Sequence, residues 1–108
     1  MAEQEADLKA LDARFHQDML DTYEPLKRKY RYNATYFLQM VLEYGGVETS
    51  RRLLWKDDVA DGFTTVWELK RLDLSVEAFV LPPECAPLFT EEERGIARAR
   101  LKGYGYFV

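Results

Sequence analysis

Apolar residues in the first part of the chain recur at steps of three and four, the spacing of one face of an α-helix. The stripe comprises Leu8, Leu11, Phe15, Met19, Tyr23, Leu26 and Tyr30. Pro25 predicts a kink or break near Asp21–Pro25, because proline removes a backbone donor and clashes with the preceding turn. The stripe keeps its phase across Pro25, so the pattern favours one long, kinked N-terminal helix over two unrelated helices.

A second helix is predicted from Ala34 to Tyr44, with Asn33 as its N-cap. This run is apolar almost all round, which is typical of a helix in the middle of a core. We therefore expect four of its side chains to be largely buried: Phe37, Leu38, Val41 and Leu42. Gly45–Gly46 ends the helix, one of the glycines supplying a left-handed cap. A short third helix, Val47–Trp55, turns Val47, Leu53 and Leu54 inward and Arg51 and Arg52 outward.

Three further helices are predicted in the second half of the chain. Asp61 caps a helix over Phe63–Leu72 that turns Phe63, Val66 and Trp67 toward the core, and Glu68 can pair with Arg71. Ser75 caps Val76–Leu81, which Pro82–Pro83 stop. Thr90 and Glu93 form a capping box at the start of a last helix, Glu91 to about Lys102. No sustained alternation supports strands. The fold class is therefore all-α, a compact bundle of five to six helices in a single domain, residues 1–108.

Composition restricts the class of protein. The 108 residues are 47% hydrophobic and carry a net charge of only −4, so a core can form without metal or disulfides. No apolar run approaches the roughly 18–20 residues of a membrane span, and the acidic N-terminus is unlike a signal peptide. One cysteine, Cys85, and one histidine, His16, argue against a disulfide, a zinc cluster or a Cys–His catalytic pair. The sequence predicts a cytoplasmic protein with no catalytic residue, cofactor or metal.

Charge falls into alternating blocks. Residues 1–24 carry seven acidic and two basic side chains, and residues 25–56 carry seven basic and two acidic ones. The densest basic stretch, with interleaved tyrosines, is the candidate binding surface, consisting of Lys27, Arg28, Lys29, Arg31 and Tyr32, joined by Arg51 and Arg52. Lysine and arginine can neutralise phosphates while tyrosine stacks on bases. The alternative is a solvated helix end, since basic residues near a helix C-terminus are favoured by the dipole without any ligand.

Aromatic residues give the other signal. Seven Tyr, six Phe and two Trp exceed what a core of this size must hide, and Tyr and Trp commonly anchor protein interfaces. The C-terminal tail, Tyr104, Tyr106, Phe107 and Val108, either docks back on its own chain or meets a partner.

Several segments together carry a resemblance: Asn33–Met40 with Gly45–Gly46, Asp61–Thr64, Trp67–Glu68, Arg71–Ala78, and Leu88–Thr90 with Glu93. They resemble an uncharacterised bacterial helical domain family whose members occur alone or as an appended module, over about residues 10–106. The resemblance implies a helical single-domain protein and assigns no activity or catalytic residue.

These observations predict a non-enzymatic intracellular domain for protein interaction or regulation, whose partner is another protein or a second copy. A nucleic-acid-binding accessory factor that uses residues 27–31 is the alternative. A membrane partner is not expected.

Overall fold

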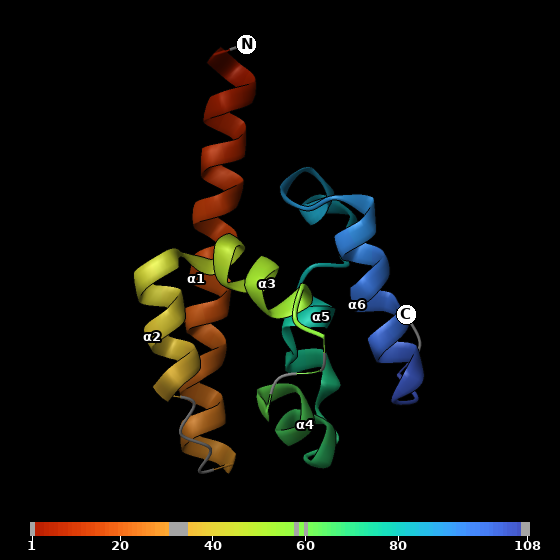
Figure 1. Ribbon diagram of the computed structural model, residues 1–108. Coiled ribbons are helices and arrows are strands. Elements are labelled where there is room, and N and C mark those ends of the chain that lie inside the picture. Colours follow the sequence, from red (N-terminus) through yellow and green to blue (C-terminus); the bar gives the residue numbers. More distant parts are fainter. Residues whose placement is uncertain (1, 31–34, 58, 60, 107–108) are drawn as a thin grey trace. The chain divides into compact units, whose positions relative to one another are not determined.

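The computed structural model describes residues 2–30, 35–57, 59 and 61–106. The elements, in chain order, are α1 (Ala2–Tyr30), α2 (Thr35–Tyr44), α3 (Gly46–Leu54), α4 (Asp61–Glu68), the 3-10 segment η1 (Leu72–Leu74), α5 (Val76–Phe79), the 3-10 segment η2 (Pro83–Leu88) and α6 (Glu91–Gly103). All regular structure in the described ranges is helical, with six α-helices, which confirms the predicted all-α class (Figure 1). The chain divides into two units, residues 1–49 and 50–108. The assignment of a single domain stays a prediction.

The first unit is built on α1, which runs to Tyr30 without interruption. The prediction of one long helix is confirmed, and the alternative of a break at Pro25 is wrong. A proline inside a helix costs about 3 kcal/mol, and the apolar stripe on both sides of it offsets that cost. Phe15, Met19 and Leu26 are buried on this stripe, whereas Leu8, also on the stripe, is 42% exposed.

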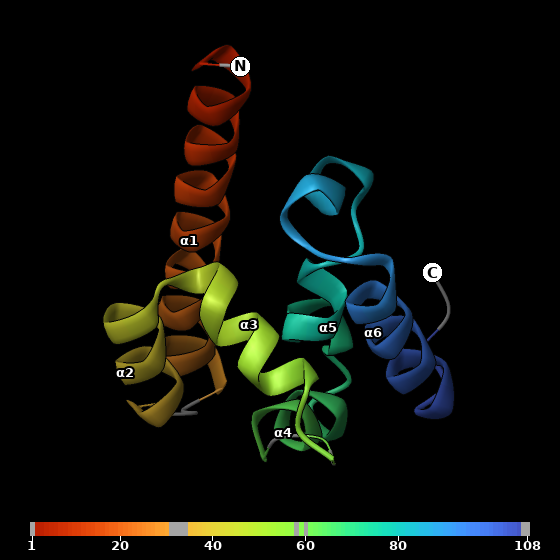
Figure 2. The ribbon, with the colours of Figure 1, turned by 45° about the horizontal axis from the view of Figure 1, so that its top comes forward.

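The helix α2 lies beside the C-terminal half of α1, and the N-terminal half of α1 extends past it in both views (Figures 1 and 2). Gly45 has a φ of +86°, so it is the predicted left-handed cap at the end of α2. Its neighbour Gly46 touches α1, where its backbone N–H donates to His16 Nδ1 at 3.0 Å. The two glycines therefore have different roles. Gly45 adopts the left-handed conformation that ends α2, and Gly46 lets the start of α3 approach α1 closely.

The prediction that α2 forms the middle of the core is wrong for most of its side chains. Only Val41 is buried. Phe37 and Leu38 are half-buried, and Leu42 is 65% exposed. A nearly all-apolar helix was expected to be covered all round, but here α2 buries one side and leaves the other exposed. The predicted cap Asn33 lies outside the described residues.

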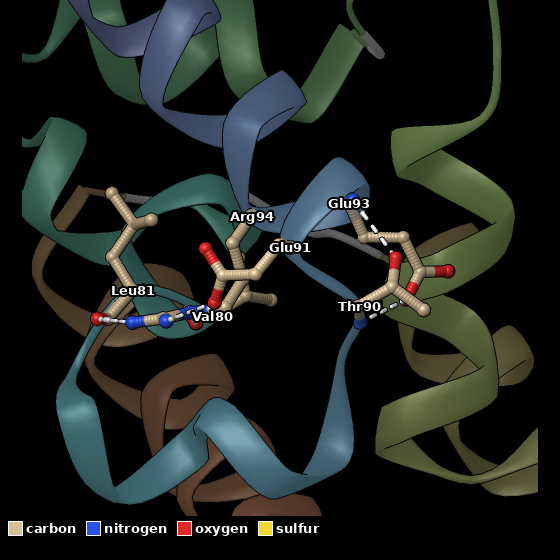
Figure 3. A network of polar contacts seen from close by, with 6 residues as sticks. All are labelled: Val80, Leu81, Thr90, Glu91, Glu93 and Arg94. Carbon is tan, nitrogen blue, oxygen red and sulfur yellow. Dashed lines mark hydrogen bonds and ion pairs between the residues drawn. The ribbon is translucent and has the colours of Figure 1, made fainter.

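The second unit contains the capping box that the sequence predicts at the start of the last helix. Thr90 Oγ1 accepts from the Glu93 backbone N–H at 3.0 Å, and Glu93 Oε1 accepts from the Thr90 N–H at 2.9 Å, which confirms the capping box (Figure 3). The helix α6 that begins there buries Ala97 and Leu101 completely. Predicted and observed bounds of α6 agree closely.

Two other helices of this unit are shorter than predicted. Ser75 caps α5 as expected, its hydroxyl accepting from the Ala78 N–H, but the helix ends at Phe79. The helix α4 ends at Glu68 because Lys70 adopts a φ of 60°. The Arg71 N–H then bonds to the Val66 carbonyl at 2.7 Å, which is the closing pattern of a Schellman motif.

Candidate interaction surfaces

The predicted basic surface begins on the last turn of α1. Lys27, Arg28 and Lys29 are all exposed there. Arg28 pairs with Glu24 one turn earlier at 3.5 Å, and the ammonium of Lys29 lies 5.6 Å from the centre of the Tyr30 ring. An exposed pair of this kind contributes only about 0–1 kcal/mol, so these side chains stay available to a partner. The other members of the stretch, Arg31 and Tyr32, lie outside the described residues.

The two arginines of α3 were predicted to point outward, and this is wrong for Arg51. Its Nη2 donates to the Leu88 carbonyl at 2.6 Å, and its guanidinium lies 5.9 Å from the centre of the Phe89 ring. Its Nε is 3.6 Å from Glu93 Oε1. Arg52 is exposed, as expected. Arg51 thus contacts Leu88, Phe89 and Glu93, and the inclusion of Arg51 and Arg52 in the candidate binding surface stays a prediction.

Among the large apolar side chains of the described residues, the two with the highest exposed fractions lie on α2. Tyr36 is 73% exposed and Leu42 is 65% exposed, and Tyr44 at the end of the helix is also exposed. The only charged residue of α2 is Glu43. Exposed apolar residues that cluster on one element are typical of a binding surface, whereas single ones are ordinary. The sequence did not predict this surface, because a continuous apolar run does not indicate which side of the helix lacks a packing neighbour.

The C-terminal tail docks on its own chain at Tyr104. The Tyr104 ring meets Phe63 at 4.9 Å and Trp67 at 5.3 Å, both edge to face. This confirms docking in cis for Tyr104, while Phe107 and Val108 lie outside the described residues. Phe63 is buried, but Trp67 is 44% exposed. The prediction that Trp67 faces the core is therefore wrong, because this much of the residue meets solvent although its ring packs edge to face with Tyr104.

Arg71, the residue predicted to pair with Glu68, pairs with Asp73. Arg71 forms two bonds of 3.0 Å to the carboxylate of Asp73, through Nε and Nη2. The hydrogen bond and charge of Arg71 lower the pKa of Asp73 below its usual value, although partial burial opposes them. Planar guanidinium and carboxylate groups match in such a fork, which explains why Arg71 pairs with Asp73. The capping role predicted for the Asp61 side chain lies outside the described side chains.

A second aromatic, Trp55, is half exposed and held by α6. Its indole N–H donates to Glu93 Oε2 at 2.8 Å. Burial by itself raises the pKa of Glu93, but the Thr90 backbone N–H, the Trp55 indole and the charge of Arg51 favour the carboxylate. Together they lower its pKa below the usual value. Glu93 thus accepts hydrogen bonds from Thr90, at the start of its own helix, and from Trp55, just after α3. Its role in these contacts is structural.

The other buried carboxylate, Glu77, pairs with Arg100 at 3.2 Å. Burial raises the pKa of Glu77, although the hydrogen bond and charge of Arg100 oppose the effect. Arg100 also donates to the carbonyl of Leu53, in the last turn of α3, at 3.0 Å and to that of Lys56, just after α3, at 2.6 Å. A buried carboxylate with a raised pKa is a candidate acid, but here its charge partner is an arginine committed to backbone carbonyls.

Cys85 and His16 each lie in a packed site of their own unit. Cys85 is buried in η2, and His16 uses Nδ1 to accept from Gly46. His16 is thus a packed histidine. Within the described side chains, no three of the His, Cys, Asp and Glu residues gather as a metal site would require. The prediction that the protein has no metal, cofactor or catalytic residue stays a prediction.

Comparison with known proteins adds no assignment. No protein-family model, curated protein or solved structure matches this chain. The resemblance to an uncharacterised bacterial helical domain stays a prediction. In the described residues, no helix combines the length and apolar character that crossing a membrane requires.

Proposed function

We propose that this chain is a non-enzymatic, cytoplasmic interaction or regulatory domain that binds a protein through α2. The observation that carries the proposal is the exposure of Tyr36 and Leu42, at 73% and 65%, on a helix with a single charged residue. Tyrosine suits this task because it is large, stiff and half polar, so it loses little entropy when it is buried at an interface. Burial of two such side chains is the kind of gain that drives association.

The test compares a variant of α2 with a control on α1. Tyr36→Ser combined with Leu42→Ser removes the exposed apolar atoms, and Gln17→Ser, exposed on α1, is the control outside α2. Each purified protein is immobilised and challenged with cell extract and with the free wild-type chain. We expect the wild type and the control to retain the same bound protein and the double variant to lose it, with unchanged helical circular dichroism. Equal retention by all three proteins would contradict the proposal.

The second candidate function is nucleic-acid binding, favoured by one observation: Lys27, Arg28 and Lys29 are all exposed on a single helical turn. If the three side chains contact phosphates, log K should fall with log salt at a slope of about −2.7 for duplex DNA. Fluorescence anisotropy with DNA and RNA at several salt concentrations measures this slope, and Lys27→Glu with Lys29→Glu should abolish binding. Absence of binding by the wild type at low salt would remove this candidate.

A further inference from the structure

An aromatic pair lies where the C-terminal ends of two helices of residues 50–108 meet. Trp67 is in the last turn of α4, and Tyr104 directly follows α6. Their rings contact edge to face, with centroids 5.3 Å apart and planes at 79°. Phe63, which is buried one turn before Trp67, makes a second contact of this kind with Tyr104 at 4.9 Å. Tyr104 is therefore held by α4, and it restricts the orientation of the Trp67 indole in turn.

The indole of Trp67 offers surface on which a flat group can stack. An edge-to-face contact covers one face of a ring at most, so Tyr104 leaves the other face of the indole uncovered. Trp67 is accordingly 44% exposed. Because the contact with Tyr104 already orders the side chain, little conformational entropy is lost when a ligand binds to it.

Both helix ends carry an exposed lysine beside this pair. The backbone N–H of Lys70 bonds to the Trp67 carbonyl at 3.0 Å, and Lys102 lies two residues before Tyr104. Arg98, one turn before Lys102 on the same face of α6, is exposed as well. Among the described residues, none forms a hydrogen bond or an ion pair with the side chain of Lys70, Lys102 or Arg98. These three cations are therefore available to an anion.

The charge around the aromatic pair is positive in balance. Glu68, the last residue of α4, is exposed and contributes one negative charge, and the C-terminal dipoles of α4 and α6 add about half a negative charge each. Three cations outweigh these contributions. Asp73 is paired with Arg71 at 3.0 Å. The acidic residues of α6, Glu91–Glu93, lie at its other end, about 15 Å along the helix axis from Lys102.

An aromatic stacking surface flanked by cations is the pattern by which proteins bind single-stranded nucleic acid without reading its sequence. A base inside a duplex is covered by its neighbours, whereas an unpaired base can reach an indole. A peptide carboxylate would pair with the cations and leave the indole unused. We propose that Trp67 stacks on an unpaired base of a single strand of DNA or RNA, while Lys70 and Lys102 contact the phosphates beside that base. Arg98 contacts the next phosphate.

This surface goes beyond both candidate functions, because it uses neither α2 nor the basic turn of α1. Fluorescence anisotropy of a labelled oligothymidylate with the full chain tests the stacking. We expect Trp67→Leu to raise the dissociation constant about five-fold or more. Trp55→Leu is the control, because Trp55 is 52% exposed and bonds to Glu93 at the opposite end of α6. It should bind like the wild type, and circular dichroism reports whether each variant stays folded.

Lys70 provides a variant whose weaker binding cannot come from unfolding. Lys70→Gly removes the cation, and glycine adopts the φ of 60° at this position without strain. With three phosphate contacts, log K should fall with log salt at a slope of about −2.1, and at about −1.4 in Lys70→Gly. Lys70→Arg keeps the cation and should bind like the wild type. Glu68→Gln removes the opposing charge and should bind more tightly.

Four results would overturn the inference. The first is a wild type that binds no oligothymidylate at low salt, and the second is binding that neither Trp67→Leu nor Lys70→Gly weakens. The third is loss of binding in Lys27→Glu with Lys29→Glu while Trp67→Leu binds normally, which would place the strand on α1. The fourth is equal competition by polyglutamate, which carries charge without bases and would indicate an acidic protein as the partner.

Discussion

Substitution of Gly46 by alanine tests how closely the start of α3 approaches α1. A Cβ at Gly46 would lie 2.8 Å from the Cα of His16, 3.3 Å from the His16 nitrogen and 3.1 Å from the Met19 sulfur. Methionine can move its sulfur, but the His16 atoms are helix backbone and cannot give way alone. The two backbones must therefore separate. Separation lengthens the 3.0 Å bond from the Gly46 N–H to His16 Nδ1 as well.

The magnitude follows from three terms. Overpacking in a well-packed site costs about 1–3 kcal/mol, and loss of one hydrogen bond costs about 0.5–1.5 kcal/mol. Alanine gains up to about 1 kcal/mol in helix propensity over glycine, which offsets part of the loss. These terms sum to a loss of about 0.5–4.5 kcal/mol, so we expect Gly46→Ala to lower the free energy of unfolding by an amount in that range.

Gly95→Ala is the matched control. Gly95 also lies in a helix, α6, but a Cβ there meets no atom within 4 Å. Only the gain in helix propensity remains, so Gly95→Ala should be more stable than the wild type by about 0.5–1 kcal/mol. Urea unfolding followed by circular dichroism gives both values, with the slope against urea checked for a change in the surface exposed. A Gly46→Ala protein as stable as Gly95→Ala would refute the close approach.

Three further outcomes are expected. Leu101→Ala, at a fully buried site, should cost about 2–5 kcal/mol, whereas Leu42→Ala at low protein concentration should stay within about 0.5 kcal/mol, both measured by urea unfolding. Because the pKa of Glu93 is lowered, its contribution to stability is present above the usual carboxyl pKa of about 4.3 and is lost below it. The loss of stability caused by Glu93→Gln, measured by unfolding scans, should thus shrink as pH falls. The pKa of Glu77 is raised instead, so the stability of Glu77→Gln relative to the wild type should increase as pH rises through that range. Lys70→Gly should raise the melting temperature, since glycine adopts the φ of 60° without the roughly 1–2 kcal/mol penalty of a side chain.

Local motifs in the sequence predicted the ends of some helices closely. The capping box of Thr90 and Glu93 and the cap at Ser75 depend on side chains that bond to backbone groups within three residues. Such bonds need no distant partner, so the sequence contains all the information. The end of α4 was missed because Lys70 takes the left-handed position where glycine is usual, and no residue type marks it.

Burial could be predicted only where the apolar residues lie on a single face of the helix. On α1 the stripe correctly identified Phe15, Met19 and Leu26 as buried. On α2 nearly every position is apolar, so the pattern could not indicate that Leu42 would be left exposed. Which side of such a helix finds a neighbour depends on chain topology, and topology is set by residues far apart in sequence. The candidate surface on α2 lies where the pattern is least informative.

The arginines of residues 50–108 show that a block of basic charge can serve contacts within the chain. Arg51 donates to the Leu88 carbonyl, Arg94 to the Val80 and Leu81 carbonyls, and Arg100 to the Leu53 and Lys56 carbonyls (Figure 3 for Arg94). In each case the guanidinium satisfies backbone oxygens at or beyond the end of another element, where they have no helical partner. Arginine suits this task because its fork of donors reaches two acceptors at once and stays charged at any working pH. Basic residues at these three positions therefore stabilise residues 50–108. Lys27 and Lys29, in the last turn of α1, are exposed instead, and so a charged partner would find its cations there.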